Sequence, residues 1–175
     1  MTAAEHPFRE SLTVVLARRA PKDVVAAGLQ ALQGQRGVLA AEEAEWILRF
    51  AELSPADDDP PPDHPGAKRP GWSPHEERPG VSEFFLDELA MALDVGRGTA
   101  AFRARRAFCW RDRLPATFAA LKRGELDERR AQELFLVVEH VATELARRVD
   151  AALVGEASDL SVRALGERAR ALILE

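Results

Sequence analysis

The sequence predicts an all-α fold, a multi-helical bundle with an embedded helix-turn-helix-like pair and a Pro-rich linker. Three observations support this prediction. From residue 81 to the end of the chain, apolar residues recur at a spacing near 3.6, the period of an amphipathic helix. No segment alternates apolar and polar residues as half-buried strands do. Eight of the eleven prolines lie between Ser54 and Gly80, so the remaining chain has few helix breakers.

The composition describes an ordinary globular protein that is long enough to bury a core. The chain has 175 residues, of which 46% are hydrophobic and 30% are charged, and its net charge is −5. A single cysteine excludes a disulfide within the chain. No apolar stretch of about 18 residues is present, and charged side chains interrupt the N-terminal stretch where a signal peptide needs apolar ones. We therefore expect a cytoplasmic protein without membrane contact.

Residues 1–53 are predicted to form an N-terminal helical hairpin. Pro21 suits the first turn of a helix, and Gly34 is a plausible stop for it. A second helix is expected from about Ala40 to Leu53, with Trp46 closing one side. The side chains expected to face inward are Val24, Val25, Leu29 and Leu32 in the first helix and Ala44, Ile47, Leu48 and Ala51 in the second.

Residues 54–80 are predicted to be a Pro/Gly-rich linker or a long surface loop. Proline lacks a backbone donor and fixes φ, so this stretch cannot form a helix or a sheet ladder. The linker would separate the hairpin from a larger helical domain at residues 81–175. Deleting residues 55–79 is therefore expected to leave that larger domain folded.

The larger domain shows helical periodicity throughout. Asp127, Thr143 and Ser161 are expected to cap three of its helices, because their short side chains can accept a hydrogen bond from a first-turn amide. The last helix still runs at Glu175 without a Gly or Pro stop, which predicts that the domain is truncated at its C-terminus. The apolar stripes comprise Phe85, Leu86, Leu89, Ala90 and Leu93; Ala100, Ala104, Ala107 and Leu114; Ala131, Leu134, Phe135, Val138 and Val141; Leu145, Val149 and Leu153; and Leu165, Ala169 and Leu172.

The stretch from Leu86 to Ala107 has the layout of a helix-turn-helix, with Val95 at the turn. Asp94 stands where glycine is usual, and Asp tolerates a left-handed backbone better than most residues. Residues 96–130 carry ten basic and four acidic side chains, which would suit phosphate. The candidate nucleic-acid-binding residues are Arg97, Thr99, Phe102, Arg103, Arg105, Arg106 and Arg113.

Two interpretations of this arginine-rich face stay open. It could contact DNA phosphates, or it could be a solvated face that pairs with the acidic residues around Glu83, Asp87 and Glu88. If the face binds phosphate, replacing Arg103, Arg105 and Arg106 together by glutamine should flatten the salt dependence of DNA binding. Helicity should survive, because glutamine is nearly as good a helix former as arginine.

Three segments carry a resemblance to a known family. ELAMALDVGRGTAAFRARRA, RLPATFAALKRGELDERRAQEL and LSVRALGERARALIL resemble the domain of unknown function 222, also called the thirteen-E-twelve repeat family of actinobacteria. The resemblance covers about residues 84–175, and residues 113–127 are its most specific piece. It implies a helical region that precedes a C-terminal HNH endonuclease domain in actinobacterial proteins. Arg supplies 21 of the 24 basic residues, and this bias toward GC-rich codons is consistent with such a source.

The residues that an HNH nuclease needs are missing from this chain. Such a site uses histidines to hold a metal and activate water, with an asparagine to order it, but the chain contains no asparagine. Its histidines, His6, His64, His75 and His140, are scattered, and Cys109 has no evident partner base. We expect no catalytic residues, no metal and no cofactor.

Two functional hypotheses follow from these observations. The first is a non-catalytic helical domain of an HNH endonuclease-associated protein that assists DNA binding through residues 97–113. The alternative is a helical module without nucleic-acid binding, which packs on a missing C-terminal nuclease domain or on a second copy. The two differ in salt dependence, because phosphate contacts release counterions.

Overall fold

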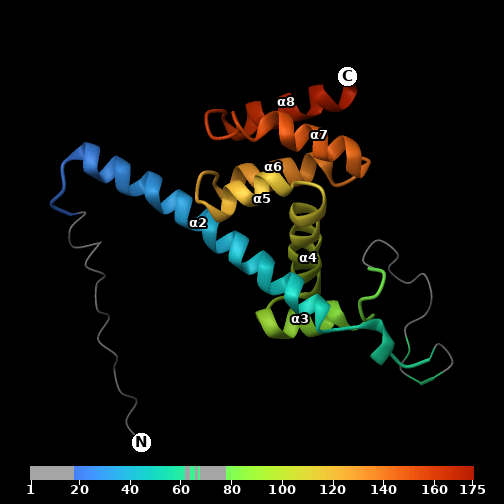
Figure 1. Ribbon diagram of the computed structural model, residues 1–175. Helices are drawn as coiled ribbons and strands as arrows, with labels where there is room; N and C mark the ends of the chain where they lie inside the picture. Colours follow the sequence, from blue (N-terminus) through green and yellow to red (C-terminus); the bar gives the residue numbers. More distant parts are fainter. Residues whose placement is uncertain (1–17, 62–63, 66, 68–77) are drawn as a thin grey trace, which may run out of the picture.

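The computed structural model describes residues 18–61, 64, 65, 67 and 78–175. Within these residues the chain is all-α, as predicted, with seven α-helices, one 3-10 turn and no strand (Figure 1). The elements are α2 (Lys22–Glu52), η1 (Ala56–Asp58), α3 (Phe85–Leu93), α4 (Arg97–Asp112), α5 (Pro115–Lys122), α6 (Glu128–Val138), α7 (Thr143–Leu153) and α8 (Val162–Leu174).

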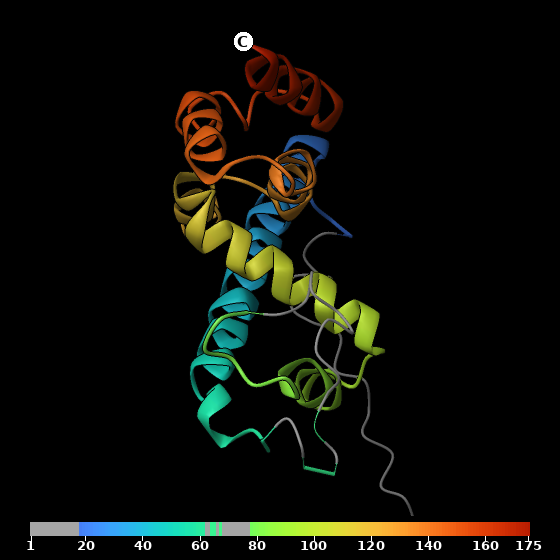
Figure 2. The ribbon, with the colours of Figure 1, turned by 90° about the vertical axis from the view of Figure 1, so that its right-hand side faces the viewer.

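Helix α4 lies at the centre of the fold, and it packs against α2, α3, α5 and α6. In the view of Figure 2 it crosses α2. Small residues on α4, such as Ala100 and Ala104, are almost completely buried and let its neighbours approach closely. Trp110 is fully buried on the same helix, and its indole N–H donates to the carbonyl of Ala131 at 3.2 Å. Since α4 is enclosed on several sides, it is a core helix.

The predicted break at Gly34 is wrong, because α2 is one continuous helix of 31 residues. Gly34 and Gly37 lie where α2 meets the connection between α5 and α6. A Cβ atom added at Gly34 would lie 2.8 Å from the carbonyl oxygen of Gly124, and one added at Gly37 would overlap the carbonyl of Leu126. These glycines therefore serve close packing of backbones, and the cost of glycine inside a helix is offset by that contact.

The predicted inward face of α2 is correct only in its second half. Ala44, Ile47, Leu48 and Ala51 are buried as expected. The first three turns instead extend away from the other helices (Figure 1), and their apolar side chains are exposed. Trp46 is 76% exposed and closes nothing. The exposed apolar side chains of the first turns include Val24, Leu29 and Leu32.

The division into an N-terminal hairpin and a separate domain is also wrong. The buried residues of α2 belong to the same hydrophobic core as those of α3 to α8. The two ends of the Pro-rich segment lie side by side, since Ser82 N–H donates to the carbonyl of Ser54 at 2.8 Å. The carboxylate of Asp59 accepts hydrogen bonds from the Ser82 hydroxyl at 2.5 Å and from Glu83 N–H at 2.8 Å. The Pro-rich segment is thus a loop that leaves and rejoins one body.

The local signals at helix ends are largely confirmed. Asp94 has φ of 50° and ends α3 in the left-handed region. Asp127 and Ser161 are N-caps whose side chains accept from Arg130 N–H and Ala164 N–H. Thr143 is not a cap, because Ala142 occupies that position. No helix was expected between Leu114 and Asp127, where the structure has α5.

Candidate functional site

One arginine of the predicted face of α4 is buried, and the others are partly exposed. Arg106 is only 5% exposed. Its guanidinium lies 4.7 Å from the centre of the Trp110 ring. It donates to Glu128 at 2.7 Å and to Glu43 at 3.2 Å. A guanidinium held by two carboxylates and an aromatic ring is a structural element of the core.

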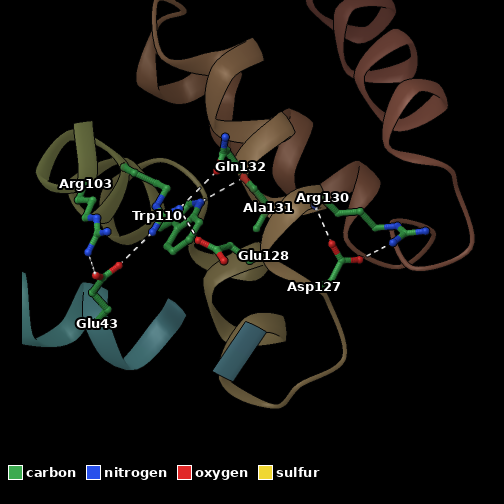
Figure 3. A network of polar contacts seen from close by, with 9 residues as sticks. Glu43, Arg103, Trp110, Asp127, Glu128, Arg130, Ala131 and Gln132 are labelled. Atoms are coloured by element: carbon green, nitrogen blue, oxygen red, sulfur yellow. Dashed lines mark hydrogen bonds and ion pairs between the residues drawn. The ribbon is translucent and has the colours of Figure 1, made fainter. Parts of the chain in front are cut away.

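The other candidate arginines also have partners within the chain. Arg103 donates to Glu43 at 2.5 Å, so Glu43 joins two arginines of α4 to α2 (Figure 3). Arg97 donates to Asp87 at 2.7 Å, as the alternative interpretation of the face expected. The remaining two, Arg105 and Arg113, lie beside Glu139, at 3.9 Å from its carboxylate for Arg105 and 2.6 Å from its carbonyl for Arg113.

Phe102, the aromatic residue among the candidates, is half-buried. Phe102 packs edge to face against Phe135, with ring centres 5.5 Å apart. Among the seven candidates, Thr99 is the one that is fully exposed. The arginines of residues 97–113 are therefore largely paired within the chain, and DNA binding through them stays a prediction. The pairing residues Glu43, Glu128 and Glu139 lie far away in the sequence, so helical projection of α4 alone could not reveal them.

The cysteine and histidines that were considered for catalysis or metal binding do not come together in a site among the described residues. Cys109 is buried, and burial raises the pKa of its thiol to about 12. In the part of the chain that the structure describes, no three His, Cys, Asp or Glu side chains lie together to hold a metal. His6 and His75 lie outside the described residues. No helix among the described residues is long and apolar enough to cross a membrane.

Two surface features remain, and the first is an apolar stripe on α2, here called the heptad stripe. Its members recur every seven residues along α2 and its C-cap; four of them are exposed, and Val25 is half-buried. Their exposed fractions reach 62% at Leu39, 76% at Trp46 and 64% at Leu53. The heptad stripe consists of Val25, Leu32, Leu39, Trp46 and Leu53. The sequence contains this sevenfold spacing, but the predicted break at Gly34 divided it between two helices, so it was not recognised as one stripe.

The second feature is an open cleft of about 790 Å³ between the end of α4, the turn before α7 and Arg78. Arg78 lies 5.1 Å from the centre of the Phe108 ring. Arg105 and Arg113 enter the cleft from α4 and its end, and Ala142 and Thr143 bring the start of α7 to it. Arg78 was no sequence candidate, because it lies in the loop segment.

Comparison with known families now adds one assignment. The family described as "Domain of unknown function (DUF222)" matches residues 73–175. This match covers more than half of the chain, and the chain belongs to that family, as the resemblance predicted. No curated protein and no solved structure matches the chain.

Proposed function

We propose that this chain is a non-catalytic helical interaction module whose partner is a second copy of the same chain, bound along α2. The heptad stripe is the observation that carries the proposal. A left-handed coiled coil places apolar residues at two positions of each heptad, on average every 3.5 residues, and the heptad stripe supplies one of these two positions along the whole helix. A stripe that packs within a globular core has no need of this strict period.

The shape of α2 supports the same proposal. Residues 22–33 project from the body with almost every side chain exposed. A helix of about 12 residues is only marginally stable alone in water. Contact with a second helix would cover the exposed Leu29 and Leu32 and stabilise these turns.

Charge favours an antiparallel pair. Residues 18–37 carry four basic and one acidic side chain, whereas residues 38–52 carry four acidic and one basic. Parallel pairing would set the two acidic halves side by side, but antiparallel pairing sets each acidic half against a basic one. Ion pairs within the chain reduce this effect, because Glu43 pairs with Arg103 and Arg106, Glu45 with Lys122 and Glu52 with Arg49. The heptad stripe is symmetric about Leu39, so an antiparallel pair centred there places Leu32 opposite Trp46 of the second copy.

The first test is the oligomeric state by analytical ultracentrifugation. Two copies of Leu39 would be buried per dimer, at about 1.5–3 kcal/mol each, so Leu39→Glu should weaken dimerisation by at least about 100-fold. Met91→Glu is the matched control, because Met91 is 83% exposed on α3, away from the heptad stripe. A wild type that stays monomeric at high concentration contradicts the proposal, and so does equal weakening by both variants.

The second test measures orientation by disulfide cross-linking in a Cys109→Ala background. A mixture of the Leu32→Cys and Trp46→Cys variants should form the mixed disulfide of an antiparallel pair. Leu32→Cys alone should not cross-link, since its two copies would lie at opposite ends of the interface. The reverse pattern would show a parallel pair and refute the charge argument.

The family resemblance implies that domains of this kind accompany an HNH nuclease, and we include that association in the proposal. A dimer along α2 would then bring two such nuclease domains into one assembly. DNA binding through residues 97–113 is the competing function, and the ion pairs of Arg103 and Arg106 count against it. Retention of duplex DNA by the Leu39→Glu monomer, with a steep salt dependence, would favour the competing function.

A further inference from the structure

We infer that the cleft beside Arg78 is a binding site for the phosphate group of a small molecule. This site is separate from the heptad stripe and does not depend on dimerisation. The inference rests on three guanidinium groups from different segments, on their unused donors and on the start of a helix at the same cleft.

The charges around the cleft are not balanced. Arg78, Arg105 and Arg113 line it together with the carboxylates of Asp112 and Glu139. Asp112 is already engaged by Arg111, which lies outside this lining and donates to both of its oxygens, at 2.7 and 3.0 Å. Among the residues that the structure describes, the three guanidinium groups therefore share one further carboxylate, that of Glu139. The cleft keeps an excess of positive charge in a chain whose net charge is negative.

Two guanidinium nitrogens in the cleft lack hydrogen-bond partners among the described residues. The Nε atoms of Arg105 and Arg113 are both buried from solvent and unpaired. The carboxylate of Glu139 lies 3.9 Å from Arg105 Nε, which is too long for a hydrogen bond. Buried donors without acceptors are costly, and a turn of the Arg105 and Arg113 side chains toward the cleft would let an oxyanion there supply the acceptors.

The position of Arg78 adds to this arrangement. Burial lowers the pKa of its guanidinium, and the like charges of Arg105 and Arg111 lower it further, against the opposing effect of Asp112. An anion placed between Arg78 and Arg105 would relieve this repulsion. Arg78 forms a cation–π contact with Phe108, which holds the guanidinium at the edge of the cleft.

The start of α7 provides further donors. Its N-cap, Ala142, has no side chain that can accept from the first-turn amides. The free amides and the positive end of the helix dipole favour an anion there. The charges converge on a concave cleft and do not extend along a stripe, so we assign the ligand as a small phosphorylated molecule, not a nucleic-acid backbone.

The experiment is a titration of the full chain with inorganic phosphate, followed by NMR of the arginine Nε–H groups at constant ionic strength, with chloride as the reference ion. Saturable shifts are expected, with half-saturation below about 10 mM. Arg105→Gln and Arg78→Gln should each weaken binding at least tenfold. Among the described residues the Arg78 side chain contacts the Phe108 ring at the edge of the cleft, so its variant tests binding even if Arg105→Gln is unstable.

Matched controls separate this inference from the proposed function. Arg163→Gln should bind phosphate like the wild type, because Arg163 is exposed on α8 and pairs only with Glu167. Leu39→Glu should also bind like the wild type. Linear shifts that chloride reproduces would overturn the inference, as would unchanged binding by Arg78→Gln. Tighter binding of duplex DNA than of a mononucleotide at equal phosphate concentration would overturn the assignment to a small ligand.

Discussion

Replacing Arg106 by methionine should destabilise the fold, because this arginine connects three helices from a buried position. Methionine keeps much of the side-chain volume over Trp110 but removes the charge. Glu43 and Glu128 then lose their guanidinium partner. Removing one partner of a fully buried ion pair costs about 3–5 kcal/mol. The side chains of Glu43 and Glu128 are 29% and 40% exposed and can regain water, so we expect about 2–3 kcal/mol.

The assay is thermal unfolding followed by circular dichroism. For a chain of this length, 2–3 kcal/mol corresponds to a fall in Tm of about 4–12 °C. Arg148→Met is the control, because Arg148 is exposed on α7, and its Tm should stay close to that of the wild type. A double-mutant cycle with Glu43→Gln should give a coupling of about 0.5–3 kcal/mol. An Arg106→Met variant that unfolds within about 1 °C of the wild type would refute the structural role of Arg106.

Three further predictions test the core. Asp150→Ala should lower the free energy of unfolding, measured with urea, by about 3 kcal/mol or more, because three donors lose their shared acceptor. These donors are Ala116 N–H, Thr117 N–H and the Thr117 hydroxyl. Asp159→Ala changes an exposed site and should lower the free energy of unfolding only slightly. Burial raises the pKa of Asp150 above its ordinary 3.8, so its protonated carboxyl contributes stability below pH 3.8 that is lost as the pH rises through the folded-state pKa. Asp150→Asn should remove this part of the dependence of the free energy of unfolding on pH. An unchanged pH dependence in that variant would contradict the raised pKa. Cys109 should react with a thiol reagent at pH 8 only as fast as the protein opens, because burial raises its pKa to about 12; rapid labelling of the native protein would show an exposed thiol.

The features that the sequence predicted correctly are local ones. Asp127 and Ser161 cap helices because a short polar side chain reaches an amide three residues away, and no distant contact is needed. Asp94 adopts the left-handed backbone at the end of α3 for a similarly local reason. The all-α class followed from periodicity that covers most of the chain.

The features that it missed depend on partners distant in sequence. Gly34 was interpreted as a helix stop, since glycine has a low helix propensity, but the carbonyl of Gly124 needs the space that a side chain would fill. Asp150 was no candidate, although it accepts from the first turn of α5 across more than 30 residues of sequence. The sequence around Gly34 and around Asp150 contains no pattern that indicates either of these distant contacts.

The arginine-rich segment shows why local charge is a poor guide to surface charge in this chain. Arginine accounts for nearly all of its basic residues, so arginine also fills structural positions that need a cation. Glutamates of α2 and α6 neutralise Arg103 and Arg106 inside the fold. On another side of α4, Arg105 and Arg113 share one uncommitted carboxylate among the described residues, that of Glu139. A phosphate-binding role therefore fits the few arginines that the fold leaves incompletely paired. The number of arginines in a segment of the sequence does not indicate how many of them are available to bind phosphate.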